Sequence, residues 1–240
     1  MTRQFVYLHG QPGGPDELSL FGPLHWPDDV AITAPDRNRV PVSLPEGPIT
    51  LIGFSMGGKV ALDWARALPE RIAHIHLIAP AGPPDSEALL DQMAGGALFR
   101  MARDRPRLFA RVARLQSLMA RLVPRVMVRM LLATAQGGDA ALALDPAFRA
   151  RMAAMLKAGL GHASQSYAAE ISAYMQPWSV SLSSITAPVT LWHGEADNWA
   201  PIALSEHLAA TFSGPVTFHR LPGLSHYSTL RHALQRIAAA

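Results

Sequence analysis

The chain has 240 residues, of which 49% are hydrophobic and 16% charged, and its formal net charge is +3. This composition suits one domain with a full hydrophobic core and gives no sign of disorder. The chain has no cysteine, which excludes disulfide bonds, thiolate chemistry and cysteine-bound metal. No signal-peptide pattern follows Met1, and no apolar run reaches the roughly 18 residues of a membrane span. We therefore expect a soluble, cytoplasmic protein without a transmembrane segment.

Short β-rich runs alternate with helical or turn-rich stretches from the start of the chain. Several of these runs are continuously apolar, which is typical of parallel strands buried on both faces. Their alternation with helices predicts an α/β fold with a doubly wound, mostly parallel sheet. The predicted strands cover residues 5–8, 30–33, 50–52, 75–78, 189–192 and 216–219.

Between the fourth and fifth predicted strands, helical periods replace strands for nearly a hundred residues. Within this stretch, Asp145 followed by Pro146 predicts the start of a helix, and Gly159 predicts its end. The sequence therefore predicts a helical cap inserted into a core, with the cap at residues 83–178 and the core at residues 1–82 and 179–240.

The segment GFSMGGKV, residues 53–60, fits two motifs that both lie on a strand–turn–helix unit. A P-loop would need a Ser or Thr after its lysine to bind Mg²⁺, but that position is Val60. A nucleophile elbow, G-x-S-x-G, needs small residues around a tight turn, and Gly53 and Gly57 provide them. The segment also follows a predicted strand and opens a predicted helix. We therefore interpret it as an elbow that exposes the Ser55 hydroxyl at the carboxyl end of the sheet.

A reactive serine needs a base to take its proton, and the base needs a carboxylate to orient it. Asp197, in HGEAD, lies just past the fifth predicted strand, and His226, in PGLSH, follows the last strand. They complete the chain order serine, acid, histidine that this kind of fold uses. Asp85 is a rival for the acid, and His162 and His193 are rivals for the base.

The motifs GFSMGG, HGEAD and PGLSH together resemble those of the α/β-hydrolase fold superfamily, and the resemblance covers residues 5–82 and 185–232. HGQPGG resembles the oxyanion loop of that superfamily. This implies that the backbone N–H groups of Gln11 and Met56 hold a developing oxyanion. Larger members of that superfamily begin with an extra antiparallel pair of strands, but here the first predicted strand begins within a few residues of Met1. In this the sequence departs from the superfamily pattern, and we expect a version of the fold with a trimmed N-terminus.

The resemblance implies a serine hydrolase that cleaves a carboxylic ester, thioester or lactone of a small molecule through an acyl-enzyme. Ser55, Asp197 and His226 would form its catalytic triad, with no metal and no organic cofactor. Because the fold does not fix the substrate, a carbon–carbon bond hydrolase of a diketone and a non-catalytic ligand-binding protein stay open as alternatives. His9, which we expect to support the oxyanion loop, and Trp199 are candidate substrate-binding residues.

The predicted cap is rich in arginine, with nine Arg, one Asp and no Lys or Glu between Leu98 and Ala133. On a helical wheel, four of these arginines fall within about 80° of one another: Arg107, Arg111, Arg114 and Arg121. The pattern predicts a basic helix face that is solvated, or that binds an acidic carrier protein or an anionic membrane surface. No nucleic-acid-binding motif accompanies it, so nucleic acid is not an expected partner.

Overall fold

The computed structural model describes residues 2–37, 43–84 and 87–240 of the chain. Its centre is a single sheet of six parallel strands in the spatial order β2-β1-β3-β4-β5-β6. All six predicted strands are confirmed, and they are β1 (Arg3–Leu8), β2 (Val30–Thr33), β3 (Ile49–Phe54), β4 (Ile72–Ile78), β5 (Val189–Gly194) and β6 (Val216–Leu221).

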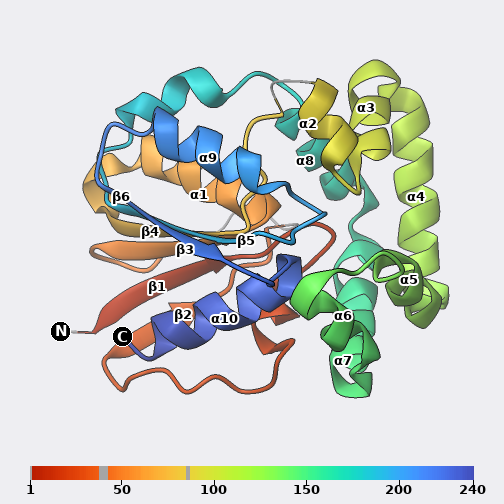
Figure 1. Ribbon diagram of the computed structural model, residues 1–240, viewed down its shortest axis with the longest axis horizontal. Helices are drawn as coiled ribbons and strands as arrows, with labels where there is room; N and C mark the ends of the chain where they lie inside the picture. The colour runs from red at the N-terminus through yellow and green to blue at the C-terminus, as the bar shows by residue number, and fades with distance from the viewer. Residues whose placement is uncertain (1, 38–42, 85–86) are drawn as a thin grey trace.

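Helices cover both faces of the sheet, as the predicted doubly wound fold requires. Figure 1 shows α1 (Met56–Ala67) and α9 (Ile202–Thr211) on one face and α10 (His226–Ala238) on the other. The short 3-10 helices η1 (Pro15–Ser19) and η2 (Pro69–Arg71) complete this part of the fold. The central strands are apolar on both sides, and every residue of β5 is buried. Because all strands run the same way, the segments that follow them meet at one edge of the sheet.

The chain between β4 and β5 forms a helical insertion, and its described residues contain no strand. Figure 1 shows these helices grouped beside the sheet rather than layered on its faces. They are α2 (Glu87–Gln92), α3 (Gly96–Asp104), α4 (Pro106–Leu122), α5 (Pro124–Leu131), α6 (Gly137–Leu144), α7 (Pro146–Ala158) and α8 (Ser164–Tyr174). The 3-10 helix η3 (Leu160–His162) lies between α7 and α8, and η4 (Ser179–Ser184) follows α8.

The predicted helix boundaries at Asp145 and Gly159 are confirmed. The Asp145 carboxylate accepts a 2.8 Å hydrogen bond from the N–H of Ala147, with Pro146 in the first helical position of α7. This cap satisfies one of the N–H groups that a helix start leaves without an intrahelical partner. In the described part of the chain, no helix combines the length and the apolar character needed to cross a membrane.

Candidate active site

Ser55 lies in the sharp turn between β3 and α1. Its backbone has φ 52° and ψ −123°, a left-handed conformation that is strained for a residue with a side chain. The turn is held by hydrogen bonds from the Ser55 N–H to the oxygen of Ile78 (3.0 Å) and from Ala81 N–H to the oxygen of Ser55 (3.1 Å). This strained turn is the backbone geometry that the elbow interpretation predicts.

The glycines around Ser55 are required by close backbone contacts. A Cβ atom on Gly57 would lie 2.0 Å from the carbonyl oxygen of Leu8, and one on Gly53 would lie 2.7 Å from the Cα of Gly58. Neither contact can be relieved by turning a side chain, because the opposing atoms belong to the backbone. The motif glycines therefore allow α1 to start directly against the end of β1.

Asp197 and His226 form a buried hydrogen-bonded pair. Asp197 follows β5, His226 is the first residue of α10, and the Nδ1 of His226 lies 2.8 Å from the Oδ2 of Asp197. The other carboxylate oxygen of Asp197 accepts hydrogen bonds from the N–H groups of Trp199 (2.8 Å) and Ala200 (3.0 Å). With Oδ1 and Oδ2 engaged in this way, the carboxylate holds the imidazole in one orientation.

The His226 ring is also fixed by aromatic neighbours. The Trp199 ring stacks on it with centroids 5.5 Å apart and an angle of 6° between the planes. The ring of Phe54, the residue before Ser55, lies 4.7 Å away. Phe54 thus connects the turn that holds Ser55 to the histidine that we predict to be its base.

Burial and charge have opposite effects on the pKa values of Asp197 and His226. Burial disfavours the charged form of His226, but the charge of Asp197 and its hydrogen bond raise the pKa of the imidazole above 6.5. Burial likewise disfavours ionised Asp197, but the charge of His226 and their hydrogen bond hold its pKa below 3.8. The pair therefore favours a carboxylate beside an imidazole that readily gains a proton.

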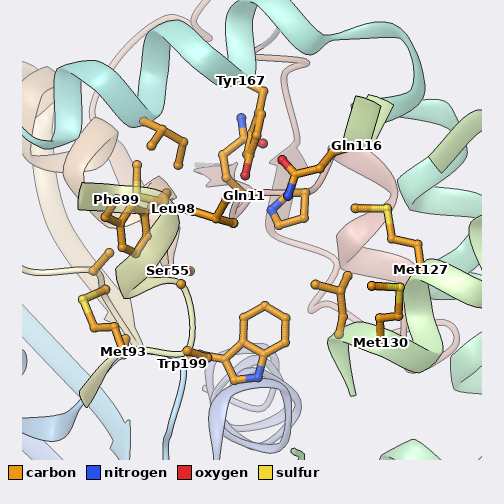
Figure 2. A pocket seen from close by; sticks show the side chains of 18 of the residues that line it. Gln11, Ser55, Met93, Leu98, Phe99, Gln116, Met127, Met130, Tyr167 and Trp199 are labelled. Carbon is orange, nitrogen blue, oxygen red and sulfur yellow. The ribbon is translucent and has the colours of Figure 1, made fainter. Parts of the chain in front are cut away.

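Ser55 opens onto a cavity of about 220 Å³ between the sheet and the helical insertion. Gln11 and Met56, the predicted oxyanion donors, line the same cavity, and so does Trp199. Figure 2 shows Met127 and Met130 across the cavity from Ser55. Most of the remaining wall is apolar and comes from the insertion, including Met93, Leu98, Phe99, Leu131 and Ile171, with Gln116, Thr134 and Tyr167 as polar members.

None of the other candidate residues that the structure describes lines this cavity. His193 lies 3.6 Å from the Oδ2 of Asp197, but its hydrogen bonds are with the Ser205 hydroxyl (2.7 Å) and the oxygen of Ala200 (2.8 Å). His162 is exposed in η3. Asp85 lies outside the described residues. His9 is fully buried and is not part of the cavity wall formed by the described residues.

Asp139, near the site, has a buried carboxyl group. Asp139 is not identifiable as a candidate from the sequence, because it simply follows two glycines at the start of a helix. Its Oδ1 accepts from the N–H and the hydroxyl of Ser228, each at 2.7 Å, and its Oδ2 accepts from the N–H of Tyr227 at 2.9 Å. Asp139 belongs to α6, so the insertion caps the helix that begins at His226.

The insertion also contacts the loops that carry Asp197 and Gln11. The side-chain amide of Asn198 donates a 2.8 Å hydrogen bond to the oxygen of Thr134. Glu170 of α8 accepts a 2.5 Å hydrogen bond from the side chain of Gln11 and pairs with Arg37. Among the described residues, no group of three or more His, Asp or Glu side chains could hold a metal ion.

Solved structures share this fold across nearly their whole length. An esterase from Thermogutta terrifontis is 18% identical with a TM-score of 0.66, and the match covers 100% of this chain and 89% of the esterase. An esterase from Exiguobacterium antarcticum is 15% identical with a TM-score of 0.65, over 99% and 92% of the two chains. A bromoperoxidase from Bacillus anthracis is 14% identical with a TM-score of 0.67, over 100% and 90%.

At these identities the similarity shows the fold alone, and no curated protein matches the chain. The family of the chain is assigned from its amino-acid sequence. The family model described as serine aminopeptidase, S33 (Hydrolase_4), matches residues 28–230, which is most of the chain. The chain therefore belongs to the serine aminopeptidase S33 family of α/β-fold hydrolases.

Proposed function

We propose that the protein is a serine hydrolase that cleaves carboxylic esters of small molecules. The observation that carries this proposal is the strained turn at Ser55, which opens onto the cavity next to the buried pair of Asp197 and His226. A histidine already oriented by a carboxylate is what a serine hydroxyl needs in order to react at neutral pH.

In the proposed reaction, His226 takes the proton of Ser55 as the Ser55 oxygen attacks the ester carbonyl. The N–H groups of Gln11 and Met56 donate to the oxyanion that forms. His226 then gives its proton to the leaving alcohol, and the acyl group stays on Ser55. Water, deprotonated by His226, releases the acid and restores the serine. Asp197 keeps the imidazole in the required tautomer throughout.

The cavity supports a small or medium-sized apolar acyl group as the preferred substrate. Its volume is about 220 Å³, and its walls are mostly methionine, leucine and aromatic side chains. Methionine is unbranched and adapts to ligands of different shapes. We infer that residues 83–178 act as a cap whose side chains select the acyl chain, because most of this wall comes from the insertion.

Initial rates on nitrophenyl esters from acetate to decanoate, measured for the wild type and Ser55→Ala in parallel, test the proposal. We expect activity with a maximum at an intermediate chain length and a loss of roughly 10⁴-fold in the variant. A matched diketone, tested beside the esters, would reveal carbon–carbon hydrolysis by much faster turnover. Equal rates for the wild type and Ser55→Ala would contradict the proposed mechanism, and saturable ligand binding without turnover would contradict catalysis.

A further inference from the structure

Among the described residues, all the large apolar side chains that are exposed belong to the helical insertion. Leu122 is 65% exposed, Met130 62% and Leu144 79%, which is unusual for side chains of this size. An apolar surface gathered in one region of a molecule marks a site of interaction with a membrane or another protein. The full set comes from α4, α5, α6 and the residue between α4 and α5: Leu108, Leu115, Leu118, Leu122, Val123, Val126, Met130 and Leu144.

The same region is strongly basic. Residues 105–138 contain no Asp or Glu. Six arginines of α4 and α5 are exposed, and none takes part in an ion pair with another described residue. They are Arg107, Arg111, Arg114, Arg121, Arg125 and Arg129. A partner for this surface must therefore bring negative charge.

A groove of about 340 Å³ lies between α5 and α7 and is lined by three arginines, Arg125, Arg129 and Arg149, with Val128, Pro146 and Ala150. Guanidinium groups form paired hydrogen bonds with phosphate oxygens, so three of them around one groove suit a phosphate group. Figure 1 shows α4 and α5 on the side of the insertion away from the sheet, with α7 next to α5. Because the sheet lies on the other side of the insertion, α4 and α5 are accessible to a large partner.

Arginine and apolar side chains lie next to one another along this surface. At about 100° per residue, Leu108, Leu115 and Leu122 form a stripe about 40° wide on α4, directly beside the stripe of arginines. On α5, Val126 and Met130 lie beside Arg125 and Arg129, on the side toward the buried Met127. A protein interface gathers its apolar residues in a core with a polar rim. Adjacent basic and apolar stripes along exposed helices instead match the boundary of a bilayer, where lipid phosphates and acyl chains lie next to each other.

We propose that the surface of α4, α5 and the start of α7, hereafter the docking face, binds an anionic phospholipid bilayer. The arginines contact lipid phosphates, and the exposed leucine, valine and methionine side chains enter the upper acyl region. Met130 is on this surface and also lines the cavity that holds Ser55. The bilayer is thus adjacent to the cavity, although docking itself does not depend on the proposed hydrolysis.

Sedimentation with lipid vesicles tests the proposal. We expect the wild type to bind vesicles that contain about one-third phosphatidylglycerol and to bind pure phosphatidylcholine weakly, with binding reduced at high salt. Changing Arg107, Arg111 and Arg114 to Gln should weaken binding by about a hundredfold. Leu115→Ser with Leu122→Ser should also weaken it. Hydrolysis of soluble nitrophenyl esters should not change in either variant.

The control is a second triple variant, Arg66, Arg231 and Arg236 to Gln, which lowers the formal net charge of +3 by the same three units outside the docking face. It should bind vesicles like the wild type. The proposal is overturned if the two triple variants bind equally or if charged and neutral vesicles bind equally. It is also overturned if the leucine variant turns a dimer into a monomer in light scattering, because a second copy would then cover this face.

Discussion

The Glu17 carboxyl group is buried beside the backbone that leads into the cavity. It accepts hydrogen bonds of 2.7 Å from the hydroxyl of Tyr7 and from the N–H of Gly10. Burial raises the pKa of Glu17 to about 7, even though both hydrogen bonds and the nearby charges act to lower it. The folded protein therefore binds this proton more tightly than the unfolded chain, where the carboxyl has its ordinary pKa of 4.5.

The free energy of unfolding should consequently depend on Glu17 between pH 5 and pH 8. The contribution of its proton is fully present below pH 4.5 and is lost as pH rises through about 7. Over this range the loss amounts to roughly 3 kcal/mol. Urea unfolding of the wild type and Glu17→Gln, at several pH values, should show the variant gaining relative stability as pH increases. Parallel pH curves for the two proteins would contradict this account.

At the scale of elements, the contact between α6 and α10 sets the environment of His226. Asp139 accepts three hydrogen bonds from the first turn of α10, whose N–H groups would otherwise lack intrahelical partners. The charged groups that act on His226 are Asp197, Asp139 and Glu17, which raise its pKa, and His193 lies 3.6 Å from the same Oδ2 of Asp197. Asp139 thus positions the histidine through the helix and also adds to its charge environment.

Replacing Asp139 with Asn should shift the pH profile of ester hydrolysis. In the wild type, kcat/KM rises with pH as His226 loses its proton, at a pKa above 6.5. Removing the Asp139 charge lowers that pKa, so the rise in kcat/KM should move to lower pH. We also expect kcat to fall about tenfold, because the first turn of α10, which carries His226, loses hydrogen bonds that stabilise it. Profiles of kcat/KM from pH 5 to 9 for both proteins measure the shift.

Ser228→Ala is the matched control for this prediction. It removes the hydroxyl that donates to Asp139 at 2.7 Å without changing any charge. We expect a lower melting temperature in both variants but a shifted pH profile in Asp139→Asn alone. If Asp139→Asn lowers stability and leaves the profile unchanged, then Asp139 has only a structural role.

Elements with a local signal could be predicted from the sequence. The six strands are short apolar runs between turns, and the turn at Ser55 needs glycines at fixed positions because the backbone approaches within contact distance. Glu17 and Asp139 could not be predicted, because their partners are 7 and 89 residues away along the chain. Their burial depends on how helices pack, which helical periodicity does not specify.

At the scale of the whole molecule, the sheet edge and the insertion build the cavity together. Parallel strands bring the segments after β1, β3, β5 and β6 to one edge, so the predicted order of serine, acid and histidine leads to a compact site. The pairing of Asp197 with His226 follows from this topology. The packing of the seven α-helices described between β4 and β5 does not follow from it, because each helix has several apolar directions that could face the core.

Covalent labelling with a fluorophosphonate tests the central claim, that Ser55 is the nucleophile and His226 its base. The Ser55 oxygen would displace fluoride and form a stable phosphonate ester. Intact mass and peptide mapping should show one label on the peptide that contains Ser55, formed faster as pH rises through the pKa of His226. Labelling should be absent in Ser55→Ala and very slow in His226→Ala. A label on another serine, or equal labelling of Ser55→Ala, would contradict the claim.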